Sequence, residues 1–206
     1  MFRWFALAVF LGPLGISAWR RWQARRAIGA IARSQEPPLL IVGRLLVALP
    51  LYGGVVGYLA NPGWMAWASL SVPSSVRWIG VALGLLTVPA VYWVLTTLGA
   101  NVSETVLTKQ RHQLVTTGPY RWVRHPLYSA GIALFLSSGL MAANWFILLW
   151  AVIALAAMRL VIIPREEAQL VLRFGDEYRR YRDGTGSLLP LLLGSRDRRL
   201  NSREDS

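Results

Sequence analysis

Long apolar stretches separated by short basic segments constrain the fold of this chain more than any other feature. The stretches cover Phe2–Trp19, Leu39–Ala60, Val76–Leu98, Pro126–Ala142 and Trp145–Ile163. A helix needs roughly 20 apolar residues to cross the hydrocarbon core of a bilayer. Charged residues make up only 16% of the chain, whereas soluble domains carry about 25%. The sequence therefore predicts an all-α integral membrane protein with about five transmembrane helices.

The composition also excludes several other classes of protein. The 206 residues include no cysteine, and the formal net charge is +12. The absence of cysteine excludes a disulfide scaffold and a cysteine-ligated metal site, and we expect no metal at all. The arginines gather beside the apolar stretches, where they suit lipid headgroups, so membrane lipids and not nucleic acid are the expected partners.

The distribution of basic residues predicts the orientation. Segments 20–33, 109–124 and 159–203 hold 5, 4 and 10 of the 22 lysines and arginines, and segment 61–75 holds none. The positive-inside rule then places the N-terminus outside and the C-terminus in the cytoplasm. The first stretch is expected to remain as a helix, because its arginines follow the apolar run, whereas a signal peptide carries its positive charges before that run.

Three regions are expected along the chain. Residues 1–98 hold the first three spans, residues 99–194 form a catalytic region, and residues 195–206 form a disordered tail. Only Ala143 and Asn144 separate the last two spans, so these spans must form an antiparallel hairpin. The cofactor site is expected on the cytoplasmic side, between this hairpin, the loop before it and the C-terminal segment.

The loop before the fourth span contains a candidate anion site. Gly118-Pro119 predicts a turn, and Pro126 suits the first position of a helix that His125 caps. The N–H groups at this helix start, together with Arg124 and His125, could hold a carboxylate or a phosphate. The alternative is that Arg121 and Arg124 only anchor the span at the headgroups.

A second cluster follows the fifth span. Glu166 and Glu167 come directly after it, where carboxylates are unfavourable without a partner. Gly175 predicts a helix end, and Tyr178 and Tyr181 mark a further short helix. The alternative is a solvated face in which Glu166 pairs with Arg173 or Gln169.

The hairpin brings these two clusters side by side. One offers cations and helix N–H groups, and the other offers carboxylates. This combination suits a zwitterionic ligand with an aromatic part, and S-adenosylmethionine meets that description.

The sequence LVTTGPYRWVRHPLY over Leu114–Tyr128, followed by the Glu166-Glu167 pair and FGDEYRRY, resembles the isoprenylcysteine carboxyl methyltransferase family. The resemblance implies S-adenosylmethionine as cofactor and S-adenosylhomocysteine as product. It implies catalytic roles for Glu166, Glu167 and Arg165. The implied cofactor-binding residues are His112, Gln113, Leu114, Val115, Gly118, Tyr120, His125, Pro126, Leu127, Tyr128, Glu166 and Glu167.

One position departs from that family. Its eukaryotic members carry a substrate-binding arginine four residues before the glutamate pair, where this chain has Ile162 flanked by Arg159 and Arg165. The expected activity is carboxyl methylation of a lipophilic small-molecule or prenylated acceptor at the cytoplasmic face. The alternatives are a phospholipid amine N-methyltransferase, in which a glutamate would act as base, and a non-catalytic membrane protein that retains the fold.

Overall fold

The computed structural model describes residues 1–28, 38–99 and 114–191. Within these ranges the chain is helical. Its elements in order are α1 (Phe2–Ile28), α2 (Pro38–Ala60), the 3₁₀ turns η1 (Pro62–Ala68), α3 (Ser74–Leu98), the 3₁₀ turn η3 (Gly118–Arg121), α4 (Pro126–Ala142), α5 (Trp145–Ala157), the π turn η4 (Met158–Ile162), α6 (Ile163–Phe174) and α7 (Asp176–Gly184).

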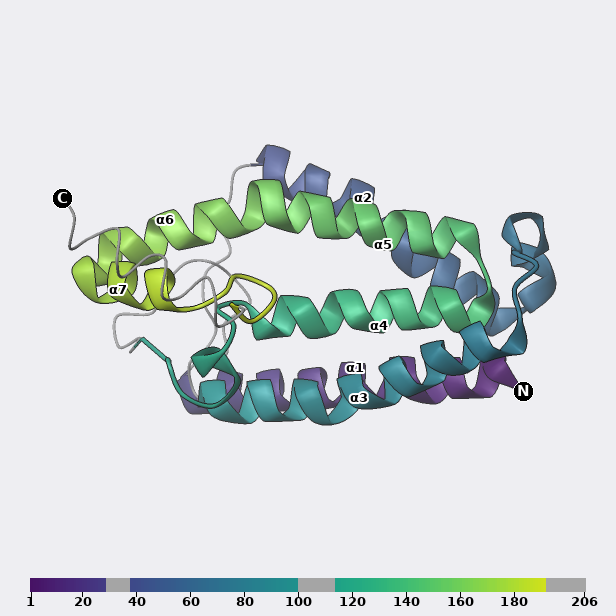
Figure 1. Cartoon of the computed structure of the whole chain (residues 1–206), viewed down its shortest axis with the longest axis horizontal. Coiled ribbons are helices and arrows are strands. Elements are labelled where there is room, and N and C mark those ends of the chain that lie inside the picture. Colours follow the sequence, from purple (N-terminus) through teal and green to yellow (C-terminus); the bar gives the residue numbers. More distant parts are fainter. Residues whose placement is uncertain (29–37, 100–113, 192–206) are drawn as a thin grey trace.

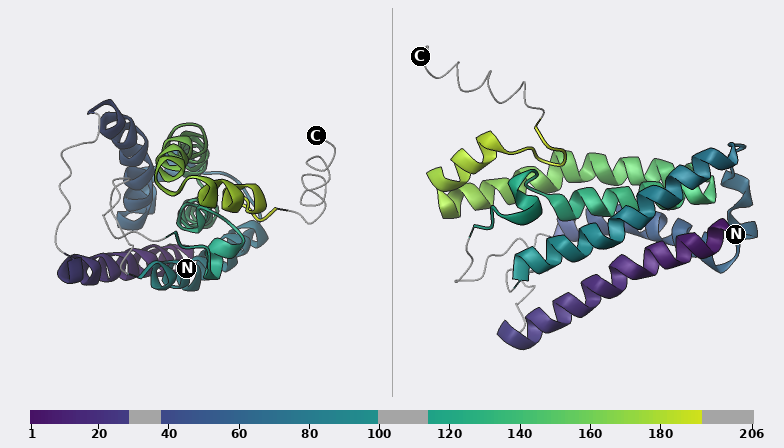
Figure 2. Two further views of the ribbon diagram at one scale, coloured as in Figure 1. Left: turned by 90° about the vertical axis from the view of Figure 1, so that its left-hand side faces the viewer. Right: turned by 60° about the horizontal axis from the view of Figure 1, so that its bottom comes forward.

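The long helices lie side by side along the long axis of the molecule (Figure 1). One end of the bundle holds the start of α1, η1 and the turn between α4 and α5, and we call it the η1 end. The opposite end holds the end of α3, the start of α4, α6 and α7, and we call it the site end. Figure 2 shows α4 in the middle of the bundle, with the other long helices around it.

The predicted membrane spans correspond to helices. Four helical runs in the described part are long and apolar enough to cross a membrane, and α4 is a shorter apolar helix with the predicted bounds Pro126–Ala142. At 17 residues, α4 measures about 25 Å. It packs against α1, α2, α3 and α5 and buries ten of its residues. A central helix of this kind is shielded from lipid by its neighbours, which makes its shorter length tolerable.

Two helices extend beyond their predicted ends. The first was expected to end at Trp19 and continues to Ile28. The last span was expected to end at Ile163, but α5, η4 and α6 form one continuous helical run that ends at Phe174. Polar residues continue both helices past the apolar stretch, because hydropathy marks the end of a span and not the end of a helix. The predicted helix end at Gly175 and the short helix after it are confirmed.

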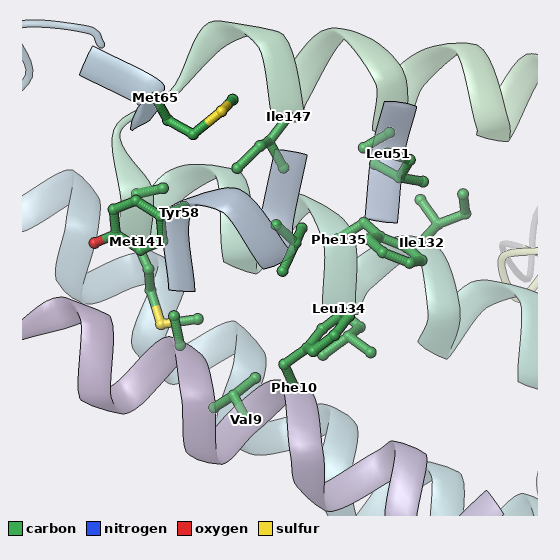
Figure 3. Packing of buried hydrophobic residues seen from close by; sticks show 14 of the residues in the cluster. Val9, Phe10, Leu51, Tyr58, Met65, Ile132, Leu134, Phe135, Met141 and Ile147 are labelled. Atoms are coloured by element: carbon green, nitrogen blue, oxygen red, sulfur yellow. The ribbon is translucent and has the colours of Figure 1, made fainter. Parts of the chain in front are cut away.

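The core forms where α1, α2, α4 and α5 meet (Figure 3). Phe10, Tyr52 and Phe135 make edge-to-face ring contacts there, with centroids 5.0 to 6.1 Å apart. Beside this cluster α3 approaches α4 closely, since a Cβ at Gly80 would lie 2.8 Å from Leu140 Cβ. Small residues are a common means of close packing between membrane helices.

The arrangement of the helices agrees with the charge pattern. The connection 61–75, which carries no charge, lies at the η1 end, and the arginine-bearing end of α1 and the arginines of α7 lie at the site end (Figure 1). The expected antiparallel hairpin is confirmed, with Ala143 at a φ of 50° in the tight joint between α4 and α5. The expected tail 195–206 lies outside the described residues.

Candidate functional site

A tight turn delivers the chain to the start of α4. Gly118 begins η3 with a φ of 59°, a conformation that favours glycine. A Cβ at this position would also lie 2.7 Å from Thr97 Oγ1 at the end of α3. His125 then caps α4, and Pro126 takes the first helical position, as the sequence predicted. The turn therefore determines the position of His125 at the start of α4.

The two glutamates reach the same place from the other arm of the hairpin. They lie in the first turns of α6, directly after the π turn η4. A π turn contains more residues than an α turn, so it rotates the residues that follow relative to an uninterrupted α-helix. Glu166 and Glu167 both turn inward, and their side chains are only 20% and 14% exposed.

The imidazole of His125 lies between the two carboxylates. Its Nδ1 is 3.6 Å from Glu166 Oε2, and its Nε2 is 3.2 Å from Glu167 Oε1. Tyr128 stacks on the imidazole with an angle of 12° between the ring planes, and its hydroxyl donates to Glu166 Oε1 at 2.5 Å. The alternative interpretation, a surface pair of Glu166 with Arg173 or Gln169, is therefore not the principal contact of Glu166.

Arg124 joins this group to the C-terminal segment 185–188. Its Nε donates to Glu167 Oε1 at 2.9 Å, and its Nη1 donates to the carbonyls of Arg182, at 2.8 Å, and of Thr185. Two further bonds run between the main chains, from Arg124 N to Gly186 O at 2.8 Å and from His125 N to Ser187 O at 3.0 Å. The main-chain N–H of His125, at the start of α4, is therefore bound by the protein itself.

Three tyrosines complete the site. The Tyr181 hydroxyl donates to the Tyr120 carbonyl at 2.7 Å. Burial raises the pKa of Tyr120 and of Tyr178, and raises the pKa of Tyr181 to about 12, so all three are neutral phenols at physiological pH. Tyr178 is 1% exposed, and among the described residues its hydroxyl has no hydrogen-bond partner. A buried polar group of this kind costs about 1–3 kcal/mol unless it is satisfied.

Some of the predicted site residues in the described part gather here, and others do not. His125, Tyr128, Glu166 and Glu167 are in mutual contact, and Pro126 is buried at the helix start. Leu127 packs instead against the α3 residues Val91 and Leu95. Among the other predicted residues, Leu114, Val115, Gly118 and Tyr120 are half-buried and Arg165 is exposed. His112 and Gln113 lie outside the described residues.

The sequence predicted the C-terminal segment at the site but not the bonds that it makes there, and it did not predict the buried position of Tyr178. The 185–188 segment has no motif, since its role rests on main-chain groups that pair with residues about 60 positions away. Tyr178 was assigned to an interfacial helix, and periodicity with α6 could not indicate its direction, because the helix is interrupted at Gly175.

Known proteins match the part of the chain that contains this site. A sequence model of the isoprenylcysteine carboxyl methyltransferase (ICMT) family matches residues 79–172, which run from α3 to α6 and include η3, α4 and the glutamate pair. Residues 79–172 are therefore similar to the isoprenylcysteine carboxyl methyltransferase family. The helices α1 and α2, α7 and the 185–188 segment lie outside the family match.

Three curated relatives match parts of the chain. The protein-S-isoprenylcysteine O-methyltransferase of Schizosaccharomyces pombe is 35% identical over 96 residues, which are 46% of this chain and 41% of that protein. The methanethiol S-methyltransferase of Mycobacterium tuberculosis is 39% identical over 71 residues, 34% of this chain and 28% of that protein. The uncharacterized protein YpbQ of Bacillus subtilis is 43% identical over 61 residues, 29% of this chain and 36% of that protein. The chain thus matches less than half the length of each of these relatives.

A solved structure shares the fold. The structure of the eukaryotic intramembrane Ras methyltransferase ICMT superposes with a TM-score of 0.53 and 19% sequence identity, covering 91% of this chain and 68% of that chain. The predicted all-α membrane fold is confirmed by this likeness and by the apolar helices.

Proposed function

We propose that this protein is an S-adenosylmethionine-dependent methyltransferase that methylates the carboxylate of a lipophilic acceptor at the cytoplasmic membrane face. The observation that carries the proposal is the cluster in which Glu166 and Glu167 lie on either side of His125, at one end of a membrane bundle. This cluster falls within the family region 79–172, and two of the relatives are named for methyl transfer.

The residues present fit this cofactor. Arg124 and His125 both contact Oε1 of Glu167, and neither of them uses its Oε2. A carboxylate accepts about four hydrogen bonds, so Glu167 retains acceptors for an ammonium group. The Tyr178 hydroxyl, which has no partner among the described residues, offers a donor to the same region. We assign Glu166 and Glu167 to the amino-acid end of the cofactor and the half-buried Tyr120 to its aromatic part.

Methyl transfer requires little of the protein beyond the alignment of the cofactor with the acceptor. The bound cofactor supplies a methyl group on a positively charged sulfur. His125, Arg124 and Tyr128 orient the two carboxylates. The 185–188 segment covers this cluster of side chains and excludes water from it. A carboxylic acid acceptor with a pKa near 4 is already ionised at neutral pH, so the site needs no general base.

The surroundings suit an acceptor with an apolar tail. Large apolar side chains are exposed on α2 and around η4, among them Leu39, Leu46 and Leu160, which are 81%, 65% and 73% exposed. In a bilayer these surfaces face lipid. A prenyl or acyl chain dissolved in the same lipid would reach the site sideways. A phospholipid amine is the second candidate acceptor, favoured by the pair of carboxylates beside His125, one of which would accept the proton from the amine.

The proposal is tested on the purified full chain in detergent. We expect S-adenosylhomocysteine to bind by calorimetry, and labelled methyl to pass to a prenylcysteine acceptor as an ester. Glu167→Gln should weaken cofactor binding at least tenfold, whereas Glu177→Gln, on the exposed side of α7, should not. A wild-type protein that binds no S-adenosylhomocysteine at millimolar concentration would refute the proposal. Methylated phospholipid amine as the sole product would select the second candidate.

A further inference from the structure

A cavity of about 350 Å³ opens at the η1 end of the bundle, at the opposite end from the glutamate cluster. Its lining includes the side chains of Arg3, Tyr58, Met65 and Arg77, which come from α1, α2, η1 and α3. The cavity therefore forms where four elements meet, and nothing in the methyltransferase proposal uses it.

The two arginines are held in place but keep unused donors. Arg3 donates through Nε and Nη2 to the carbonyls of Leu59 and Ala60 at the end of α2, both at 2.7 Å. Arg77 donates through Nε to the Met141 carbonyl at the end of α4, at 2.9 Å, and its Cζ lies 4.1 Å from the centre of the Phe2 ring. A guanidinium has five N–H groups, so each arginine retains donors beyond those that its helix carbonyls accept.

Among the residues that the structure describes, no carboxylate balances the charge of the two guanidinium groups. The acidic residues of the described ranges all lie in α6 and α7, at the opposite end of the molecule. The ends of α2 and α4 supply a partial negative charge of about one half each. This compensates only part of the two full positive charges beside the cavity. An anion in the cavity would balance the remainder.

The other walls resemble a membrane interface. Met65 and Ala142 give the cavity an apolar side, and the Tyr58 hydroxyl points away from the packed residues of the core (Figure 3). This hydroxyl lies 3.5 Å from Arg77 Nη2. Several tryptophans are exposed at the same end of the bundle, a position typical of the headgroup region; they are Trp4, Trp64, Trp67, Trp78 and Trp145.

We propose that this cavity binds the phosphate of an anionic phospholipid. The two guanidinium groups and the Tyr58 hydroxyl provide the donors for the phosphate oxygens, in the geometry that arginine offers to phosphate. The apolar wall receives the glycerol and the beginning of the acyl chains. A lipid with a net negative charge is favoured over a zwitterionic one, because no carboxylate of the described residues is present to receive a headgroup cation.

The test is a lipid titration of the purified full chain in detergent, read by native mass spectrometry as the fraction of protein that carries one lipid. We expect phosphatidylglycerol to bind at least tenfold more tightly than phosphatidylcholine. The double variant Arg3→Gln/Arg77→Gln should lose this preference, and Arg179→Gln, which removes one charge at the site end, should keep it. Equal binding of the two lipids by the wild type, or an unchanged preference in the double variant, would overturn the proposal.

Two further measurements separate lipid binding from unfolding and from the binding of free phosphate. Since the arginines also bind helix ends, their loss could unfold the protein, so Ala66→Glu adds a carboxylate to the cavity lining and leaves both arginines intact. It should abolish the preference, and its neutral counterpart Ala66→Gln should not; a preference that survives Ala66→Glu contradicts the proposal.

Inorganic phosphate at 10-fold excess over the lipid, on the order of the ratio needed to compete for a shared site, should displace little lipid. Full displacement would show a free-phosphate site and refute a lipid site.

Discussion

The Nε2 atom of His125 lies 3.2 Å from Glu167 Oε1, although 42 positions separate the two residues in sequence. His125 is the cap of α4 and Glu167 lies in the first turns of α6, so the contact joins the two arms of the last hairpin at the site end. Arg124 donates to the same carboxylate oxygen. A single oxygen of Glu167 thus contacts the side chains of both Arg124 and His125.

This relationship predicts strong coupling between His125 and Glu167. His125→Ala should weaken S-adenosylhomocysteine binding by about 1.5–3 kcal/mol, because both carboxylates lose the group that orients them. The double variant His125→Ala/Glu167→Gln should lose less than the sum of the two single variants. Calorimetry on the four proteins measures the coupling. Strictly additive losses would show that the two side chains act independently.

The buried hydroxyl of Tyr178 predicts opposite effects on stability and on binding. Tyr178→Phe removes a polar group without a partner among the described residues, so the Tm of the ligand-free protein should stay the same or rise. If that hydroxyl contacts the cofactor, affinity should fall about tenfold. Tyr181→Phe is the matched control, since it loses the bond to the Tyr120 carbonyl and should lower the Tm. A Tyr178→Phe protein with unchanged affinity would remove this residue from the cofactor site.

The turn at Gly118 predicts a local stability defect. Gly118→Ala places a Cβ in a left-handed conformation and against the Thr97 side chain, and should cost about 2 kcal/mol of unfolding free energy. Gly131→Ala, where the added Cβ meets open space in the middle of α4, should be neutral or stabilise the helix by up to about 1 kcal/mol. Thermal unfolding of both variants distinguishes them. Equal Tm values would contradict the expected role of the turn.

The acceptor is expected to meet an arginine near Ile162. Arg159 and Arg165 each lie three residues from that position, and both are exposed. Arg165 is adjacent to the glutamate pair, so Arg165→Ala should raise the KM for a carboxylate acceptor about tenfold and leave cofactor affinity unchanged. Arg159→Ala, one turn farther from the glutamates, should have a smaller effect. The reverse order would assign the acceptor carboxylate to Arg159.

The charge distribution predicts the orientation in the membrane. A reporter inserted near Ser69, in the connection at the η1 end, should report the outer side, and one fused after Ser206 should report the cytoplasm. Both reporters on one side would refute the orientation.

Local patterns in the sequence predicted the helices well. The bounds of α4 followed from Pro126 and from the two-residue joint after Ala142, and the end of α6 followed from Gly175. These features act within a few residues, so one sequence reveals them. The glutamates were also expected to lie beside the His125 loop, because the two open ends of an antiparallel hairpin lie next to each other.

Contacts between distant segments could not be predicted in the same way. Arg3 and Arg77 bind the last carbonyls of α2 and α4. Nothing in the sequence around these arginines indicates which carbonyls they bind. The 185–188 segment binds through main-chain groups, which every residue possesses. Such pairings depend on how the bundle assembles and not on the identity of the neighbouring residues.

The bonds from the 185–188 segment to Arg124 and His125 also set an order of events during biosynthesis. A ribosome delivers α1 to α6 to the membrane before it reaches residue 185, and chains fold progressively from the N-terminus as they emerge. During that interval Arg124 lacks the carbonyls of Thr185 and Gly186, and the His125 N–H lacks the carbonyl of Ser187. The helical bundle can thus be inserted and assembled before the proposed cofactor site is complete, and translation of the 185–188 segment supplies the missing partners of Arg124 and His125.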